Sequence, residues 1–295
     1  MYELYQVGAD SFYLQAPAKI GIFRLNETDV CLIDSGNDKN AGRKVRQILD
    51  GNGWQLTSIY NTHSNADHIG GNRYLQQQTN CRIYAPDIER DFINHPILEP
   101  AFLYGGFPCG DLRHKFLLAQ ESRAMLLTDN CLPEGLSSIK LAGHFFDMAG
   151  YRTKDDVVYL ADCLSSRETL DKYQIGFIYD VGEYLNTLEH VKTMTAKMFV
   201  PAHAEPTDDI SELAQMNIDK VLEIADKILN ICKTPVTFEK LLQRLFDDYE
   251  LRMNFEQYVL VGSTVRSYLS YLRDTERMDI QFYNNEMLWQ SKENA

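Results

Sequence analysis

The segment "NTHSNADHIGG", residues 61–71, restricts the fold of this chain more than any other part of its sequence. It places His63, Asn65, Asp67 and His68 directly after the apolar run "TSIY", which has the composition of a β-strand. A loop at the end of a strand can direct several side chains into one cleft. Imidazole and carboxylate groups together are ligands of zinc and other first-row divalent ions. The segment therefore predicts a metal site at the end of a strand.

Three later segments repeat this design, in which an apolar strand ends on a potential metal ligand. "LAGHFFDMAG" contains His144, "VVYLADCLSS" contains Asp162, and "MFVPAHAEP" contains His203. One such histidine alone would more often be a hydrogen-bonded structural residue. Four of the seven histidines in the chain occupy these positions, however, and their recurrence predicts one shared site. Cys163, next to Asp162, is interpreted as a buried thiol and not as a further ligand.

The motif resembles the "THxHxDHxGG" signature of the metallo-β-lactamase fold superfamily, written here as "THSNADHIGG". "LIDSG" with Asp34, and then His144, Asp162 and His203, follow in the order of that family, so that the resemblance covers about residues 1–208. The resemblance implies an α/β fold, a four-layer αββα sandwich with the metal site at the edge between two sheets. It also implies that Asp34 supports the motif loop without binding metal.

The resemblance further implies ligands for two metal ions. They are His63, the Asn65 position and His144 for the first ion, Asp67, His68 and His203 for the second, and Asp162 as the bridge.

Asn65 departs from the signature, which has a histidine at this position. An amide oxygen is a weaker donor to zinc than imidazole, so the first site is expected to lose affinity. The second site keeps its usual ligands. We therefore expect one or two divalent ions, zinc before iron or manganese, since imidazole and carboxylate accept all three. A smaller departure is Ala161, at a position before Asp162 where the family usually has glycine.

Residues 86–120 interrupt the strand pattern with helical spacing, prolines and a Gly-Gly-Phe-Pro turn. The segment is too apolar for a solvated linker, and exposed apolar insertions of this size are seldom left uncovered. It is expected to form a lid over the cleft or a contact with a second subunit in a homodimer. Tyr104 in this insertion and Tyr173 after Asp162 are candidates for binding the substrate.

The sequence changes character at about Ser211. Three runs there have apolar residues at helical spacing, and Thr237 is a good N-cap for the second of them. The tail "MDIQFYNNEMLWQ" predicts a hairpin around Asn284 and Asn285. Three helices and a hairpin are the order of a winged-helix module. We therefore predict a metal-binding domain over 1–208 and a small helical, winged-helix-like domain over 209–295. The second domain is expected to close one side of the active site or to mediate dimerisation.

Charge and composition restrict the partners. The net charge is -13, and residues 210–295 carry 10 Lys or Arg against 14 Asp or Glu, which argues against nucleic acid. The sequence lacks an apolar run of the roughly 20 residues that cross a bilayer, and its first residues do not resemble a secretory signal. The six cysteines are scattered without a CxxC pair. The expectation is a cytoplasmic protein with reduced thiols, a small-molecule substrate and no membrane contact.

These observations favour a metal-dependent hydrolase. A metal-bound hydroxide would attack an ester, thioester, phosphoester or amide-like bond, with Asp67 orienting it or moving its proton. The alternative is a member of the fold that has lost its chemistry and binds a small molecule. A ribonuclease is a third and weaker hypothesis. The substrate itself is not determined, because one fold and one type of metal site serve many reactions.

Overall fold

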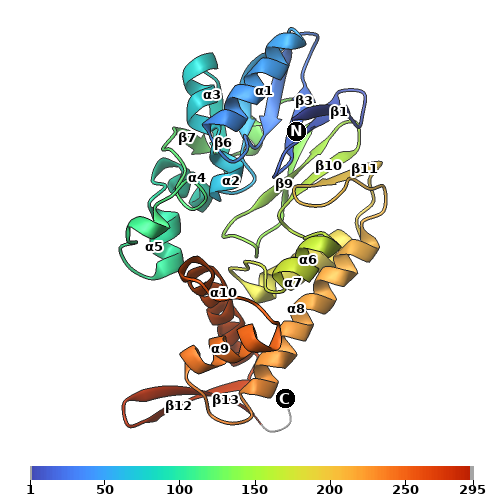
Figure 1. The fold of residues 1–295 in the computed structure, drawn as a ribbon. Helices are drawn as coiled ribbons and strands as arrows, with labels where there is room; N and C mark the ends of the chain where they lie inside the picture. The colour runs from blue at the N-terminus through green and yellow to red at the C-terminus, as the bar shows by residue number, and fades with distance from the viewer. Residues whose placement is uncertain (1, 293–295) are drawn as a thin grey trace.

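Two β-sheets form the centre of the molecule in the computed structural model, which describes residues 2–292 (Figure 1). The first sheet has seven strands, and neighbours in the chain are neighbours in the sheet. Its strands are β1 (Glu3–Gln6), β2 (Ser11–Gln15), β3 (Ile20–Arg24), β4 (Asp29–Ile33), β5 (Gln55–Tyr60), β6 (Arg82–Ala85) and β7 (Ala124–Leu126).

The second sheet has four strands in the order β11-β10-β9-β8. They are β8 (Leu136–Lys140), β9 (Ala149–Thr153), β10 (Val157–Ala161) and β11 (Met198–Pro201). Large apolar side chains from both sheets fill the space between them, among them Phe23, Tyr60, Tyr151 and Tyr159. The Tyr159 hydroxyl donates to the Phe12 carbonyl at 2.7 Å, so a polar group inside this layer is satisfied across the sandwich.

Helices cover the outer face of each sheet. α1 (Lys39–Gly51) and α3 (Asn72–Thr79) bury Val45, Leu49 and Leu75 in one core with the first sheet. α7 (Val181–Lys192) and α8 (Ser211–Ile231) pack against one another and bury their apolar residues in one core with β10 and β11. The result is helix, sheet, sheet, helix, which confirms the predicted αββα sandwich.

The strand directions bring the polar loops to one edge. β4 to β7 run parallel to one another, and so do β10 and β11. Parallel strands end at the same edge of a sheet, where open α/β folds bind their ligands. Asp34 follows β4, the histidine motif follows β5, and Asp162 and His203 follow β10 and β11. The motif also begins the short helix α2 (Ala66–Ile69).

The insertion forms two helices, α4 (Asp87–Asn94) and α5 (Leu98–Tyr104), followed by 3-10 turns at Gly110–Leu112 and, beyond the insertion, at Asp129–Cys131. Its aromatic residues pack against the loop that follows His144. Phe92 lies 5.3 Å from Phe145 and Phe102 lies 5.2 Å from Phe146, measured between ring centroids. The insertion is thus packed onto one wall of the site.

The C-terminal part contains α8, α9 (Phe238–Asp248), α10 (Phe255–Asp274) and a hairpin of β12 (Met278–Tyr283) and β13 (Glu286–Ser291). This confirms the three helices and the hairpin, whose turn residues Asn284 and Asn285 have φ of 48° and 66°. Thr237 caps α9 by accepting from the Lys240 amide. In Figure 1, α8 runs from the sandwich to the hairpin. One continuous apolar core joins β10, α7, α8, α9 and α10.

Across residues 2–292, none of the helices combines the length and the apolar composition needed to cross a membrane.

Candidate metal centre

The side chains that the sequence placed at strand ends lie together in two clusters that share Asp162. The first cluster consists of His63, His144 and Asp162, and the second consists of Asp67, His68, Asp162 and His203. Within each cluster the potential ligand atoms all lie within 4.8 Å of one another. Segments up to about 140 residues apart in the sequence therefore meet at one point, at the sheet edge described above.

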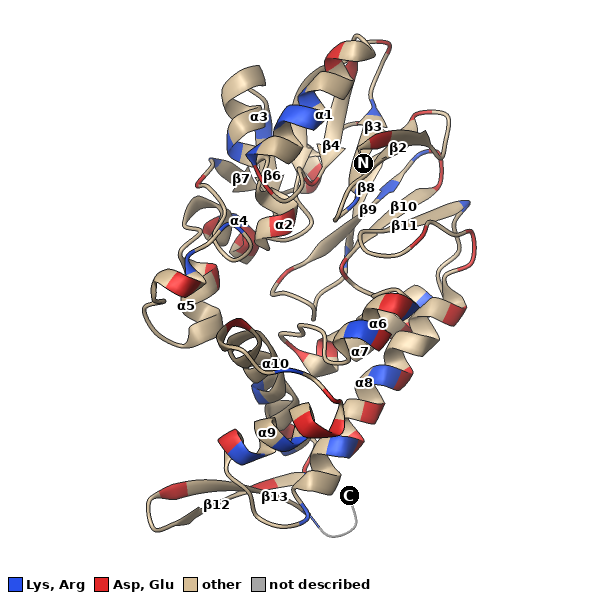
Figure 2. Cartoon of the chain, in the orientation of Figure 1, with Lys and Arg blue, Asp and Glu red and all other residues tan. Residues whose placement is uncertain are grey.

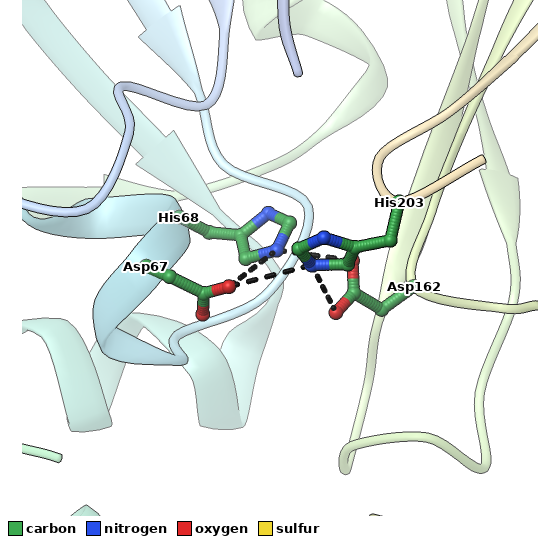
Figure 3. Close-up of side chains that lie close together, drawn as sticks. All are labelled: Asp67, His68, Asp162 and His203. Atoms are coloured by element: carbon green, nitrogen blue, oxygen red, sulfur yellow. Dashed lines mark ion pairs between the residues drawn. The ribbon is translucent and has the colours of Figure 1, made fainter. Parts of the chain in front are cut away.

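The second cluster has the spacing of a metal site (Figure 3). Asp162 Oδ1 lies 3.0 Å from His68 Nε2, and Asp162 Oδ2 lies 3.2 Å from His203 Nε2. Asp67 Oδ2 lies 3.4 Å from His203 Nε2 and 3.7 Å from His68 Nε2. Zinc with bonds of roughly 2.0–2.1 Å in a tetrahedron holds its ligand atoms about 3.3 Å apart. The four side chains match that spacing.

Buried polar atoms that lack a good hydrogen bond also indicate a metal site. Among the described residues, His63 Nε2, His68 Nε2 and Asp162 Oδ1 are buried without a hydrogen bond of good geometry, although the last two atoms lie 3.0 Å apart. The opposite ring nitrogens are anchored: His63 Nδ1 lies 2.9 Å from Thr62 Oγ1, and His68 Nδ1 lies 2.8 Å from Asp34 Oδ2. Buried polar atoms without partners are costly, and metal-binding histidines characteristically use their second nitrogen in this way. The residues therefore fit a divalent ion.

Asp34 is connected to the histidine motif through Thr62 and His68. It accepts hydrogen bonds from the Thr62 amide at 2.8 Å and from the Thr62 hydroxyl at 2.7 Å, besides its contact with His68. Its backbone has φ +64°, in the left-handed region that aspartate tolerates better than most residues. The resemblance implied a supporting role for Asp34, and these contacts connect its carboxylate to the motif loop.

Two glycines let the motif loop approach the Asp34 loop. A Cβ atom at Gly70 would lie 2.3 Å from the backbone carbon of Asn37, and one at Gly71 would lie 2.3 Å from the Ser35 carbonyl oxygen. Any side chain at these positions would push the two loops apart. The Gly-Gly pair in the motif is thus required for close packing beneath the metal centre.

In the second cluster, carboxylate and imidazole groups lie close together and shift one another's pKa values. The Asp162 carboxylate is the main cause that raises the pKa of His203 to about 10. Burial alone would lower the pKa of His68, but Asp162, Asp67 and Asp34 outweigh it and hold that pKa well above its usual value. Burial likewise opposes ionisation of Asp67, yet His68 and His203 lower its pKa to about 2. The carboxylates are therefore ionised at neutral pH.

The first cluster contains the departure from the family pattern. His144 Nε2 lies 3.2 Å from Asn65 Oδ1 and 3.8 Å from Asp162 Oδ2. Burial, together with the nearby charge of His68, lowers the pKa of His63 well below its usual value. An uncharged imidazole at His63 is the form that binds metal. The side-chain oxygen of Asn65 thus lies beside His144, one of the residues that would hold the first ion.

The insertion contributes two buried glutamates that sequence reasoning missed. Glu89 accepts from the Ser64 amide at 2.9 Å and from the Ser64 hydroxyl at 2.6 Å, and burial raises its pKa to about 7. Glu99 accepts from Asn65 Nδ2 at 2.9 Å, and burial raises its pKa well above the usual value. The available signal was a glutamate within an apolar run, "ILEPAF".

Ala161 explains how Asp162 reaches both clusters. Its φ of +52° lies in the left-handed region, which costs a residue other than glycine about 1–2 kcal/mol. The pairing of β10 with β11 shifts at this point. The strand therefore bends just before Asp162, and glycine, which the family usually has here, would adopt the same conformation without strain.

A cavity of about 620 Å³ opens beside the metal centre, with Asp67, His144, Asp162 and His203 in its wall. Its other walls come from residues 165–177, including helix α6 (Arg167–Tyr173), and from α10 through Gln257, Leu260, Val261 and Thr264. The C-terminal module was expected to close one side of the active site or to mediate dimerisation, and its helix α10 lines this cavity.

The two candidate tyrosines lie apart from one another. Tyr173 lines the cavity beside the metal centre and is 49% exposed. Tyr104 instead lines a separate hollow between α5 and α10, where its ring centroid is 6.2 Å from that of Phe255.

Two solved structures share this fold along nearly the whole chain. A metallo-beta-lactamase family protein from Thermus thermophilus superposes with a TM-score of 0.74 at 15% identity, and the match covers 96% of this chain and 99% of that one. A beta-lactamase domain protein from Burkholderia ambifaria also gives 0.74, at 14% identity, over 98% of this chain and 94% of that one. At this identity the likeness shows the fold alone.

Sequence relatives match over short segments. A hydroxyacylglutathione hydrolase of Rhodopseudomonas palustris is 62% identical over 34 residues, which are 12% of this chain and 13% of that protein. One of Methylobacillus flagellatus is 39% identical over 61 residues, 20% of this chain and 24% of that protein. The chain thus matches less than a quarter of the length of either relative. The sequence model of the Metallo-beta-lactamase superfamily matches residues 17–203, well over half of the chain. The chain belongs to the metallo-beta-lactamase superfamily.

Proposed function

We propose that this protein is a metal-dependent hydrolase that acts on a small molecule with an acyl or phosphoryl bond. The observation that carries the proposal is the pair of clusters sharing Asp162, with buried unsatisfied ligand atoms, in the wall of a cavity of about 620 Å³. A cavity of this size holds a typical metabolite. A divalent ion bound there would supply an acidified water and a Lewis acid for the scissile bond.

The protein's own groups would orient the reactants. The Asp67 side chain is 36% exposed and faces the cavity, whereas the His68 side chain is fully buried. With a pKa of about 2, Asp67 is ionised at neutral pH and could hold the attacking water by accepting a hydrogen bond from it. The other cluster residues hold the geometry.

Thioesters come first among the candidate substrates. The relatives with matching segments are named hydroxyacylglutathione hydrolases, a name that denotes an acyl thioester substrate. The cavity beside the metal centre has apolar walls from Ile175, Phe177 and Leu260, with amides at Gln174 and Gln257 and charged groups at Glu168 and Lys172. Such a lining suits a molecule with both apolar and polar parts. Esters, phosphodiesters and amide-like bonds are the next candidates.

Nucleic acid is a poorer candidate. Figure 2 shows acidic and basic residues interspersed along α8 and α9, without a continuous basic face. The nucleic-acid phosphates need clustered Lys and Arg, so a ribonuclease is disfavoured by this surface.

The second candidate is a binding protein without hydrolytic activity. The contact of Asn65 Oδ1 with His144 Nε2 at 3.2 Å favours it, because a hydrogen bond there would engage the nitrogen that otherwise binds the first ion. This candidate predicts a metal content of at most one ion and no turnover.

The test begins with protein stripped of metal and then loaded with zinc, manganese or iron. Hydrolysis of an S-acyl glutathione, a nitrophenyl ester and a nitrophenyl phosphodiester is measured for the wild type and for His68→Ala. His190→Ala, which replaces an exposed histidine that belongs to neither cluster, is the matched control. We expect metal-dependent hydrolysis that His68→Ala lowers at least 100-fold and His190→Ala leaves intact. Absence of metal-dependent turnover on all three substrates would contradict the proposal.

A further inference from the structure

Asn65 takes the place of a ligand histidine, and the structure shows what holds its side chain. Its Nδ2 donates to Glu99 Oε1 at 2.9 Å, and its Oδ1 lies 3.2 Å from His144 Nε2. We propose that Glu99, on α5 of the insertion, is a positioning residue that turns the Asn65 oxygen toward the first cluster. Asn65 then serves as an oxygen ligand where the family has imidazole. This inference rests on the proposed function and concerns how its first metal position is completed.

The Glu99 carboxyl determines which end of the amide faces the metal centre. An asparagine side chain has one donor end and one acceptor end. In the structure the donor end lies on Glu99 Oε1 and the oxygen end lies toward His144 Nε2. Glu99 is only 4% exposed, so water does not replace its hydrogen bond with Asn65. With its donor end held by Glu99, the amide presents its oxygen end to His144.

The backbone of Asn65 supports the same conclusion. Its carbonyl accepts from the His68 amide at 2.9 Å, which fixes its position at the start of α2. Asparagine at such a position usually caps the helix with its side chain. Here, within the part of the chain that the structure describes, the Asn65 side chain makes no capping hydrogen bond. The Asn65 side chain instead donates its hydrogen bond to Glu99.

The consequence is a difference between the two metal positions. The first combines the imidazoles of His63 and His144 with the oxygens of Asn65 and Asp162. The second combines the imidazoles of His68 and His203 with two carboxylates. A neutral amide oxygen attracts a cation less than a carboxylate does. We expect two ions to bind, the first more weakly than the second.

The test measures metal binding and is separate from turnover. Stripped protein is titrated with zinc alone by calorimetry, and with cobalt, whose absorption spectrum reports the coordination geometry of each ion. Glu99→Met keeps the length of the side chain and removes the acceptor, whereas Glu99→Gln keeps an acceptor oxygen. We expect Glu99→Met to weaken the weaker site about 10- to 100-fold, the usual effect of losing a partner that orients a ligand. The tighter site should not change, and Glu99→Gln should resemble the wild type.

A double-mutant comparison shows whether Glu99 acts through Asn65. Asn65→Ala should weaken the same site as Glu99→Met, and combining the two should have no further effect. Thermal unfolding of each variant is recorded first. If Glu99→Met does not fold, the comparison of Asn65→Ala with Glu99→Gln decides, because the inference requires the first to lose the weaker ion and the second to keep it.

Other results would overturn the inference. They are a weaker site that Glu99→Met leaves unchanged, equal losses in Glu99→Met and Glu99→Gln, or a single bound ion in the wild type that Asn65→Ala does not affect. Two bound ions with no effect of Glu99→Met would defeat this inference alone. A wild type that binds no zinc would defeat the proposed function as well, so the two failures are distinguishable.

Discussion

At the scale of single residues, Asp34 connects two parts of the histidine motif, Thr62 and His68. It accepts from both the amide and the hydroxyl of Thr62 and contacts His68 Nδ1 at 2.8 Å, all in a buried place. The orientation of the His68 ring therefore depends on one carboxylate that does not itself belong to either metal cluster.

Replacing Asp34 tests this dependence. Asp34→Ala leaves several buried donors without a partner, at about 1–3 kcal/mol each, so we expect the free energy of unfolding to fall by about 3 kcal/mol or more. Metal affinity should fall about 10- to 100-fold. Asp34→Asn tolerates the left-handed backbone and keeps one acceptor, so its losses should be smaller. Urea denaturation and zinc titration check both; equal effects of the two variants would argue against the support role.

His203 makes metal binding depend on pH. In the metal-free protein the neighbouring Asp162 raises its pKa to about 10, so the ring carries a proton at pH 7. A metal ion binds only the neutral ring, and binding must therefore release this proton. Apparent affinity should rise with pH between 6 and 8, about tenfold per unit for each proton released. Calorimetry in buffers of different ionisation enthalpy counts the protons; an affinity independent of pH would contradict the assignment.

The insertion acts at the scale of elements, because its helices pack against the histidine motif and the loop that follows His144. Phe92 on α4 packs against Phe145 and Phe146, the residues that follow His144, with centroid distances of 5.3 and 5.2 Å. α4 and α5 also present Glu89 and Glu99 to the motif loop. The position of these glutamates therefore depends on an aromatic contact between two distant segments.

Phe92→Ala should disturb both stability and the metal centre. Truncating a buried phenylalanine costs about 3–5 kcal/mol. Phe107 lies beyond α5 in the same insertion and is 76% exposed, so Phe107→Ala should change the free energy of unfolding by less than about 0.5 kcal/mol. Thermal unfolding of the two variants, with zinc titration, makes the comparison. Similar behaviour of both would show that the insertion is not packed as described.

At the scale of the whole molecule, the core on the outer side of the second sheet continues past the predicted domain boundary at 208. Leu160 of β10, Leu188 of α7 and Ile218 of α8 belong to one cluster with residues of α9 and α10. α10 also forms part of the cavity wall beside the metal centre. The C-terminal helices thus contribute to both the stability and the shape of the site.

A fragment of residues 1–208 tests this continuity. Removing α8 to α10 exposes side chains of β10, β11 and α7, each worth about 1.5–3 kcal/mol when buried. A few such losses equal the whole stability of a domain, about 5–15 kcal/mol. We expect the fragment to lack near-ultraviolet circular dichroism and a cooperative transition, whereas the full chain unfolds in one step. A folded fragment that binds zinc would show instead that the first 208 residues form an independent domain.

The sequence by itself determined the strand-end clusters and the C-terminal helices with their hairpin. These follow from local patterns: apolar runs of strand or helix period, and ligand types placed directly after them. The αββα sandwich was instead implied by the resemblance of the motifs to the metallo-β-lactamase superfamily. Even the turn at Asn284 and Asn285 was visible, because asparagine is one of the few residues that adopt positive φ readily.

Only the tertiary structure decided what surrounds these groups. The bond between Asn65 and Glu99 joins residues 34 apart, and the contact between Asn65 and His144 joins residues 79 apart. The cavity wall likewise brings α10 beside Asp162. None of these pairs leaves a periodic signal, because each depends on how finished helices and loops pack together. The side chains that can bind a metal can thus be recognised from local sequence patterns. The environment that sets the role of Asn65 exists only in the folded chain.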